Sequence, residues 1–325
     1  MTDFLTHPAF IWSVVGFVIS LLIFWMISFV VASYFVYVCT LKRRKKEQWG
    51  RDLPSEMTPE HISMYDTGLA WAQQNKDKKE DVHIVSGGLN LYGEYYDFGY
   101  DRCAIILSGR TESLRYGYYF AIPYAKNGCN ILVTDPRAHG LSDGTYNTVG
   151  FEESGDYAAW IKMLHEEKGI SSVVLHGICI GSAGGLLALT TRDCPPIVDA
   201  LVAEGMFPNF GESVKNHMRE QRRVIFPTFM LVNMWMKKYT GHSMKKGPID
   251  VIDKLQTPLL MLHSKEDIYS TPEYAQKLFD KAGSKNKKLV WFDHGRHSML
   301  RITDTERYDN AIAELLSSLP VPTTK

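Results

Sequence analysis

The residues best suited to covalent chemistry lie at 171–186, SSVVLHGICIGSAGGL, where a β-rich apolar run leads through a glycine-flanked cysteine into a helical pattern. Gly177 and Gly181 stand two residues before and two residues after Cys179. A nucleophile elbow needs this spacing, because side chains at those positions would collide in the tight strand-to-helix turn. The helix that follows would point its N–H groups and the positive end of its dipole at the thiol, which favours the thiolate. Cys179 is therefore the predicted nucleophile.

Two nearby serines are alternatives to this cysteine. Residues 140–144, GLSDG, match the string G-x-S-x-G literally, but they lie in a loop after a strand and no helix follows at once. Ser182 is next to the predicted turn, but Ile180 occupies the position two residues before it, where a side chain is poorly tolerated. A buried cysteine without a chemical role is the remaining interpretation, since free cysteine is often buried.

A catalytic cysteine needs a base and usually an acid that orients this base. With a nucleophile elbow, the chain order is nucleophile, acid, histidine. Asp267 follows the apolar run at 258–262, and His297 follows the run at 288–292. The sequence therefore predicts that Asp267 fixes the tautomer of His297, which deprotonates Cys179 and later protonates the leaving group.

Weaker candidates exist for both roles. Glu266 precedes Asp267, and Glu204 follows the apolar run at 200–203, so either carboxylate could serve as the acid. His294 stands three residues before His297 and is the alternative base. A loop histidine is usually exposed and idle, but the position of His297 after the last strand favours a role for it.

The oxyanion hole is expected to combine two backbone N–H groups. One belongs to Ile180, the residue after the nucleophile. The other comes from the loop after the apolar run at 103–107, where the donor is the N–H of Arg110 or Thr111. Gly109 in this loop permits close approach of the chain.

Short apolar runs that alternate with helical patterns must position these groups. The runs lie at 81–85, 90–96, 103–107, 130–134, 172–176, 200–203, 258–262 and 288–292, and the amphipathic stretches at 114–127, 151–167, 182–190, 272–281 and 305–316. Gly87 and Gly88 separate the first two runs and predict an antiparallel hairpin. Continuous apolar runs suit strands buried on both faces. The predicted fold class is α/β, a mostly parallel sheet with right-handed crossovers and an antiparallel start.

A long connection after residue 203 breaks this alternation. Its length of about fifty residues exceeds that of an ordinary strand–helix connection and predicts an inserted cap at about residues 206–250. Within it, residues 224–236, VIFPTFMLVNMWM, are apolar but too few to span a membrane. Basic residues flank them: Arg219, Arg222, Arg223, Lys237 and Lys238. The stretch is either a cap helix packed on the core or a lid or interfacial helix that lines an apolar acyl pocket.

The amino-terminal region has the character of a membrane anchor. Residues 10–41 carry no formal charge, and about 20 apolar residues span a bilayer. The segment has no basic n-region and is too long for the apolar core of a signal peptide. Five basic residues, 42–46, follow it directly. The positive-inside rule then predicts a single-pass protein whose later residues all face the cytoplasm.

The composition agrees with this division. The 325 residues hold 36 Lys+Arg and 36 Asp+Glu, so the net charge of zero gives no reason to expect nucleic acid as a partner. The five cysteines, Cys39, Cys103, Cys129, Cys179 and Cys194, lack paired spacings and are typical of free thiols in a reducing compartment. The predicted organisation is a tail at 1–9, the anchor at 10–41, a basic juxtamembrane linker and helix at 42–80, the catalytic domain at 81–320 and a tail at 321–325.

Five segments resemble, in order, the landmarks of the α/β-hydrolase superfamily, in its serine-aminopeptidase-like and acylglycerol-lipase-like branch. They are LSGRTES, ILVTDPRAHGLSDGTYNTVGFEESGDYAAWI, LHGICIGSAGG, PLLMLHSKEDIYSTPEYAQKLF and FDHGRHSM. The resemblance implies an eight-stranded sheet with helices on both faces, a helical cap after the sixth strand, no cofactor or metal, and hydrolysis of an ester or amide bond. It gives Cys179 the nucleophile position, Asp267 the acid, His297 the base, and Arg110 and Ile180 the oxyanion donors.

The chain departs from this family at two positions. The family usually has His-Gly where this chain has Ser108-Gly109, and most relatives carry serine where this chain has Cys179. In having a cysteine at the nucleophile elbow, the chain is similar to dienelactone hydrolases and polyhydroxyalkanoate synthases. We therefore expect a membrane-anchored hydrolase that cleaves an ester, thioester or amide through an acyl-enzyme, with membrane lipid around the anchor and a small, preferably lipophilic acyl substrate. Acyl transfer and a non-catalytic binding or scaffold role are the alternatives.

Overall fold

An eight-stranded β-sheet forms the centre of this computed structural model, which describes residues 7–45, 47–50 and 58–320. The strands are β1 (Lys79–Ser86), β2 (Leu89–Tyr96), β3 (Arg102–Leu107), β4 (Asn130–Thr134), β5 (Ser172–Ile178), β6 (Val198–Glu204), β7 (Leu259–Ser264) and β8 (Lys287–Phe292). Their order across the sheet is β1-β2-β4-β3-β5-β6-β7-β8. Strands β3 to β8 are parallel to one another, whereas β2 is antiparallel to both of its neighbours, β1 and β4. The predicted α/β class and its antiparallel start are confirmed.

Part of the predicted organisation lies outside the described residues. This holds for residues 1–6 of the tail at 1–9, for residues 46 and 51–57 of the linker at 42–80, and for the tail at 321–325. The linker region also contains α3 (Pro59–Gln74). Its first turn is capped by the Thr58 side chain, which accepts a hydrogen bond from the N–H of His61, and Pro59 suits the first helical position.

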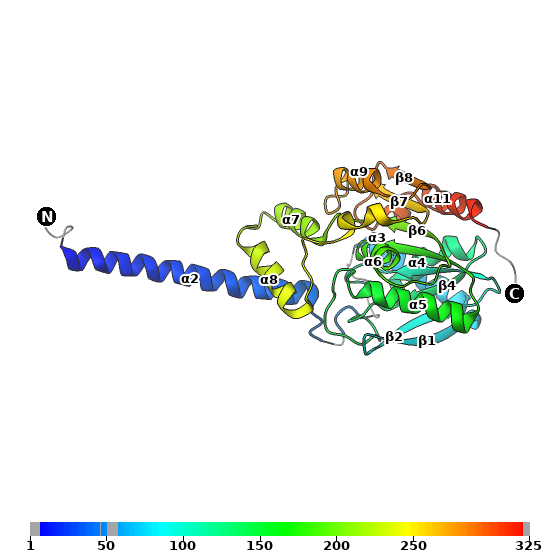
Figure 1. Cartoon of the computed structure of the whole chain (residues 1–325), viewed down its shortest axis with the longest axis horizontal. Coiled ribbons are helices and arrows are strands. Elements are labelled where there is room, and N and C mark those ends of the chain that lie inside the picture. The colour runs from blue at the N-terminus through cyan, green and yellow to red at the C-terminus, as the bar shows by residue number, and fades with distance from the viewer. Residues whose placement is uncertain (1–6, 46, 51–57, 321–325) are drawn as a thin grey trace.

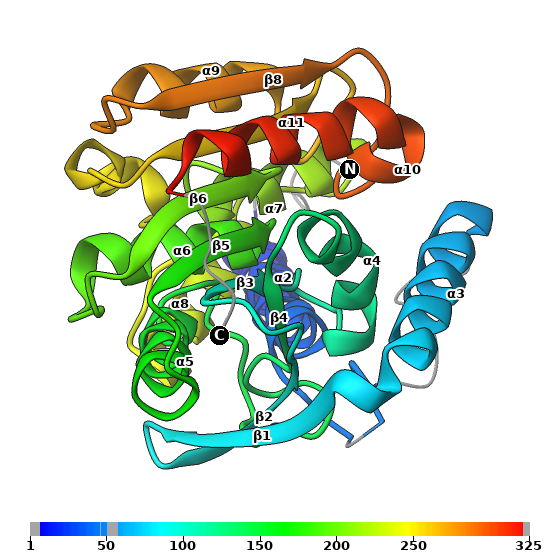
Figure 2. The ribbon, with the colours of Figure 1, turned by 90° about the vertical axis from the view of Figure 1, so that its right-hand side faces the viewer.

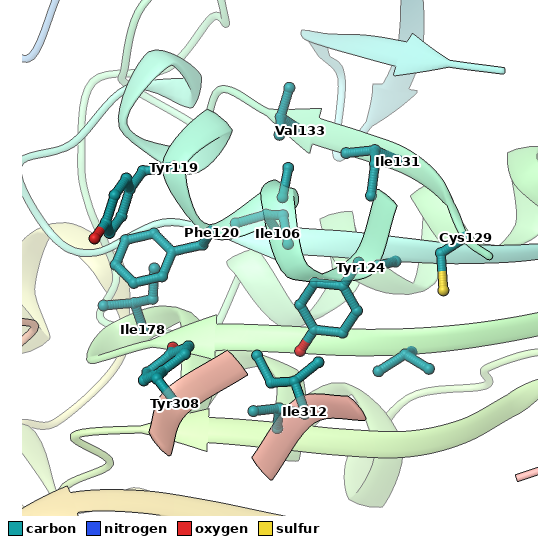
Figure 3. Packing of buried hydrophobic residues seen from close by; sticks show 14 of the residues in the cluster. Ile106, Tyr119, Phe120, Tyr124, Cys129, Ile131, Val133, Ile178, Tyr308 and Ile312 are labelled. Carbon is teal, nitrogen blue, oxygen red and sulfur yellow. The ribbon is translucent and has the colours of Figure 1, made fainter. Parts of the chain in front are cut away.

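Helices cover both faces of the sheet (Figure 2). They are α4 (Leu114–Ala125), α5 (Glu153–Lys168), α6 (Ile180–Thr191), α9 (Pro272–Lys281), α10 (Leu300–Thr303) and α11 (Thr305–Ser318), with short 3₁₀ turns at η1 (Lys76–Lys78), η2 (Pro248–Asp250) and η3 (Ile252–Lys254). Because strand side chains alternate between faces, Ile106 of β3 packs with α4 and α11, and Ile105 packs with α5 and α6. Figure 3 shows the first of these layers, where Tyr308 of α11 and Phe120 of α4 lie near Ile178.

A helical cap interrupts the domain between β6 and β7. It contains α7 (Phe210–Glu220) and α8 (Thr228–Thr240). The apolar stretch at 224–236 is therefore not one helix: residues 224–227 form the turn before α8, and the helix continues to Thr240. The reason is Pro227, which caps the helix start, since a proline has no N–H to donate within a helix.

A single long helix, α2 (Pro8–Leu41), projects from the domain on the side of the cap (Figure 1). Its first part is exposed from residue 8 to 27, apart from a half-buried Phe10. From residue 28 onward the helix lies against the domain, with Ser33, Tyr37 and Leu41 buried. Much of this contact is with α8: Tyr37 stacks on Tyr239, and the indole N–H of Trp235 donates a 3.0 Å hydrogen bond to Ser33 Oγ. The last turns of the apolar helix are thus part of the folded domain.

Candidate active site

A strained turn between β5 and α6 carries Cys179. Its φ of 55° and ψ of −110° are uncommon for a residue with a side chain. Glycine is required on both sides: a Cβ at Gly177 would overlap the backbone of Ser182, and a Cβ at Gly181 would overlap the carbonyl of Leu107. Strand, tight turn and helix therefore present the thiol at the carboxyl end of the parallel strands, and this arrangement has the form of a nucleophile elbow.

Hydrogen bonds from the elbow to β6 hold the turn. The N–H of Cys179 donates to the carbonyl oxygen of Glu204 at 2.9 Å. The hydroxyl of Ser182 is buried and donates to the carbonyls of Gly177 at 2.6 Å and of Glu204 at 3.0 Å. Ser182, one of the two alternative nucleophiles, thus stabilises the turn.

The other alternative nucleophile, Ser142, also has a structural role. The hydroxyl of Ser142 donates to the carbonyl of Asp135 at 2.7 Å and accepts the N–H of Tyr92 at 2.9 Å, and its side chain is buried. Residues 137–144 form turns and extended chain with no helix. The literal G-x-S-x-G string therefore lies in a loop, as its context predicts.

The loops after β7 and β8 bring Asp267 and His297 together. Nδ1 of His297 lies 2.6 Å from Oδ2 of Asp267. The other carboxylate oxygen, Oδ1, accepts the N–H groups of Tyr269 at 2.9 Å and Ser270 at 2.8 Å. With Nδ1 facing the carboxylate, Nε2 of the imidazole is left for chemistry, and Cys179 lies close enough to His297 to raise the pKa of this imidazole.

The charges of this pair support each other. Burial lowers the pKa of His297, but the Asp267 carboxylate and the Cys179 sulfur outweigh burial and raise this pKa well above its ordinary value. Burial raises the pKa of Asp267, but His297 and the hydrogen bonds outweigh it and lower this pKa. The site therefore favours an imidazolium at His297 beside an ionised carboxylate at Asp267.

The alternative acid, Glu266, and the alternative base, His294, contact each other and not the Asp267–His297 pair. Nδ1 of His294 lies 3.0 Å from Oε1 of Glu266, which also receives the N–H of Gly295 on its other oxygen at 3.1 Å. Both side chains are exposed, at 79% for His294 and 52% for Glu266. They form a surface ion pair, and neither bonds to Cys179 or His297.

Glu204 belongs to a buried polar network beneath the elbow. Its Oε2 accepts the hydroxyl of Tyr308 at 2.5 Å, and burial raises the pKa of this carboxyl to about 7. The same hydroxyl lies 3.0 Å from Nε2 of His176, whose Nδ1 lies 2.8 Å from the hydroxyl of Tyr124. Burial lowers the pKa of His176 to about 3, so the imidazole is neutral.

Sequence reasoning weighed Glu204 only as an acid and missed His176. The sequence does show a polar residue in each of two apolar strands, His176 in β5 and Glu204 at the end of β6. Burial of a polar group without a hydrogen-bond partner costs free energy, so such residues indicate buried partners. The partners Tyr124 and Tyr308 come from α4 and α11, far away in the sequence, so the network itself had no local pattern.

The oxyanion loop follows β3 and lies against the elbow. Ile180 is the first residue of α6, and the first N–H groups of a helix have no partner within it. Arg110 is held at two points: its carbonyl oxygen lies 2.6 Å from Nε2 of His139, and its guanidinium donates to the carbonyl of Thr40 in α2 at 3.0 Å. The hydroxyl of Ser108 is buried and makes no hydrogen bond with the described residues.

An apolar cluster packs against Cys179, which is half-buried. The buried residues of this cluster include Tyr37 of α2, Phe229 of α8 and Ile180 of α6. The described residues hold no group of three or more His, Cys, Asp or Glu side chains that could bind a metal ion. The surroundings of the sulfur therefore suit an apolar acyl group.

Two family models match the chain. Residues 105–230 match the family described as alpha/beta hydrolase fold, and residues 239–305 match the family described as serine aminopeptidase, S33. Together these segments contain Arg110, Cys179, Asp267 and His297.

Known proteins show the same likeness. The protein YqkD of Bacillus subtilis (strain 168), itself uncharacterized, is 27% identical over 220 residues, which are 67% of this chain and 70% of YqkD. The esterase Pf2001 of Pyrococcus furiosus superposes with a TM-score of 0.64 at 20% identity, covering 76% of this chain and 93% of the esterase. The esterase EaEST of Exiguobacterium antarcticum gives 0.54 at 17% identity, covering 73% and 100%. At such identities the structural likeness concerns the fold.

Proposed function

Because the chain belongs to the α/β-hydrolase superfamily, we propose that it is a membrane-anchored hydrolase that cleaves an ester, thioester or amide through Cys179. The observation that carries this proposal is the 2.6 Å contact between His297 and Asp267, with the same imidazole near a thiol on a strained elbow. These are the relations between nucleophile, base and orienting acid that covalent acyl chemistry needs.

The first half of the reaction forms an acyl-enzyme. His297 takes the thiol proton, and the sulfur of Cys179 attacks the acyl carbon, so that a C–S bond forms and the carbonyl oxygen becomes an oxyanion. The N–H groups of Ile180 and Arg110 would bind this oxyanion. As the tetrahedral intermediate collapses, the bond to the leaving group breaks, and Nε2–H of His297 protonates the departing alcohol, thiol or amine.

The second half regenerates the thiol. His297 removes a proton from water, and the hydroxide attacks the thioester carbon. The C–S bond then breaks to release the carboxylic acid, and Nε2–H of His297 returns a proton to the sulfur of Cys179. Asp267 stays ionised throughout and stabilises the imidazolium that forms in both halves. Its buried carboxylate, fixed by two backbone N–H groups, is pre-organised for that role.

Membrane anchoring rests on α2. Residues 8–27 are about 20 in number, and at 1.5 Å per residue they span about 30 Å, the thickness of the bilayer hydrocarbon core. The following residues pack into the domain, with Tyr37 and Leu41 fully buried. A cleaved signal sequence would take these buried side chains away from the folded domain, so the contacts support an uncleaved anchor. The basic residues that follow α2 favour a domain on the cytoplasmic side.

The test uses the full chain in detergent with a chain-length series of esters and thioesters. We expect Cys179→Ala to lower turnover by about a thousandfold or more, because the covalent step is lost. Cys194→Ala is the matched control, since Cys194 is also a half-buried free thiol but lies away from the site. An acyl adduct that hydroxylamine removes should appear on Cys179. Equal activity of wild type and Cys179→Ala would contradict the mechanism.

A further inference from the structure

The cap exposes an apolar and basic surface beside the point where α2 leaves the domain. We propose that this cap tip, residues 219–230, docks on an anionic phospholipid membrane, with Val224 and Phe226 inserted at its surface. The proposal rests on the membrane anchoring proposed above and adds a second contact between the enzyme and the bilayer. The contact would fix the orientation of the cap over the membrane.

The pairing of α8 with α2 sets the depth of the cap tip. Near its end, α8 contacts α2 through the stacked rings of Tyr239 and Tyr37. About one turn earlier in α8, Trp235 contacts Ser33 and Tyr34, about one turn earlier in α2. The two helices therefore run parallel, and the start of α8 lies toward the exposed part of α2.

The level of the cap tip follows from helix geometry. From Trp235 back to Thr228 are about seven residues, or about 10 Å along the axis. The same distance along α2 from Ser33 leads to about residue 26, where the exposed part of the helix ends. Figure 1 shows the turn between α7 and α8 beside α2, on the side from which α2 projects. The cap tip is thus level with the boundary of the proposed bilayer core.

Large apolar side chains are concentrated in the cap tip. Val224 is 60% exposed, Phe226 72% and Met230 55%. Outside α2 and the cap, the large hydrophobic residues exposed in the described part of the chain are single ones: Val85, Leu141 and Ile268. Apolar groups at the boundary of a bilayer gain free energy by leaving water, whereas the same groups on a water-facing surface do not.

Positive charge surrounds these apolar groups. Arg219, Arg222 and Arg223 are exposed and directly precede Val224. By contrast, Arg43 in the basic run after α2 donates hydrogen bonds to the carbonyls of two loop residues, Gly140 and Ser142. This run begins about 20 Å along the helix from residue 28, beyond the reach of headgroups at that level. The cap arginines are therefore the cations placed to meet anionic headgroups.

The experiment places the photoreactive residue p-benzoylphenylalanine at one of three positions of the full chain, reconstituted in nanodiscs of phosphatidylcholine with phosphatidylglycerol. Position 226 reports the cap tip, and position 17 reports the exposed part of α2, where Phe17 is 65% exposed. Position 85 is the control, because Val85 is as exposed as Phe226 but lies at the β1–β2 turn. Irradiation is followed by mass spectrometry of phospholipid adducts.

We expect phospholipid adducts at positions 226 and 17 and none at position 85. Adducts at 17 without adducts at 226 would overturn the docking of the cap and leave the anchor intact. Absence of adducts at 17 would overturn the anchor and the docking with it. Adducts between two copies of the chain at 226 would also overturn the proposal, because they assign the surface to self-association.

Two double variants test the two parts of the surface. We expect Arg222→Gln with Arg223→Gln to lower the adduct yield at 226 about tenfold in anionic nanodiscs, since each basic residue adds to binding at an anionic surface. An unchanged yield would overturn the role of the arginines. Val224→Ser with Phe226→Ser should raise KM for a long-chain ester dissolved in the nanodisc and leave kcat/KM for a water-soluble ester unchanged. Equal losses on both esters would overturn the membrane role of the apolar pair.

Discussion

The contact between α2 and the oxyanion loop gives the sharpest prediction about catalysis. The last carbonyl groups of a helix have no partner within it and lie at the negative end of the helix dipole. The guanidinium of Arg110 meets one of them, at Thr40, with a 3.0 Å hydrogen bond. Because the backbone N–H of Arg110 is a proposed oxyanion donor, its side chain is a positioning group that ties the donor loop to α2.

The perturbation is Arg110→Met, which keeps the length of the side chain and removes its donor. A hydrogen bond from a charged group contributes about 1.5–3 kcal/mol, and partial exposure of this one favours the lower end. Without this hydrogen bond, the loop would have to be ordered at a cost of about 1.5 kcal/mol each time its N–H binds the oxyanion. We therefore expect kcat to fall about tenfold, since about 1.4 kcal/mol corresponds to a factor of ten. Complete loss of an oxyanion donor, about 10²–10³-fold, is the upper limit.

The assay measures kcat and KM of the full chain in detergent on a water-soluble ester. Arg192→Met is the matched control, because Arg192 also donates to a backbone carbonyl, that of Phe151 at 2.8 Å, away from the site. We expect kcat to fall in Arg110→Met alone, with KM unchanged, since the oxyanion exists only in the transition state and the intermediate. Arg110→Lys should recover part of kcat. Equal kcat losses in the two methionine variants, or a raised KM with kcat intact, would refute the reasoning.

Three further predictions concern the elbow, the acid and the buried network. Gly181→Ala should cost about 3 kcal/mol or more in the free energy of unfolding, because its Cβ would overlap the carbonyl of Leu107, and chemical denaturation in detergent would measure this. Asp267→Asn should lower the pKa of His297 and reduce kcat/KM by about 10²–10⁴-fold, which a pH–rate profile would record. Burial raises the pKa of Glu204 from 4.5 to about 7, so the protonated form is favoured on folding and the wild type loses stability between about pH 4.5 and pH 7. Denaturation at several pH values should show Glu204→Gln gaining about 3 kcal/mol relative to wild type across this window.

The sheet and the elbow were predictable because local rules determine them. Gly87 and Gly88 both take left-handed conformations between β1 and β2, as a two-residue hairpin requires. Gly177 is required by the backbone of Ser182, five residues away, so the spacing of the glycines around Cys179 indicated the turn, although Gly181 is required by the carbonyl of Leu107 on another strand. Even the order of Asp267 and His297 follows from the order of parallel strands, since each residue follows a strand end.

Contacts between distant segments were not predictable from the same rules. The hydrogen bond between Arg110 and Thr40 joins residues 70 positions apart, and that between Tyr308 and His176 joins residues 132 apart. Neither pair has a spacing that one sequence could display. The start of α8 differs from the predicted one for another reason. The apolar stretch begins at residue 224, but the helix begins after Pro227, because a proline limits a helix more strictly than hydrophobicity extends one.

The helix α2 consists of an exposed first part and a second part that packs on the domain. A helix that only tethered a domain would need few contacts with it, yet ten of the 14 residues from 28 to 41 are buried or half-buried, and several of them pack with the cap and the loops near the site. Full burial of each large apolar side chain, such as Leu41, contributes about 1.5–3 kcal/mol, which favours a fixed position of the domain. The same helix reaches the oxyanion loop through Thr40 and the apolar cluster around Cys179 through Tyr37. The helix α2, the cap and Cys179 are therefore parts of one packed unit, and with the membrane anchoring proposed above the site would lie at a fixed height above the lipid surface.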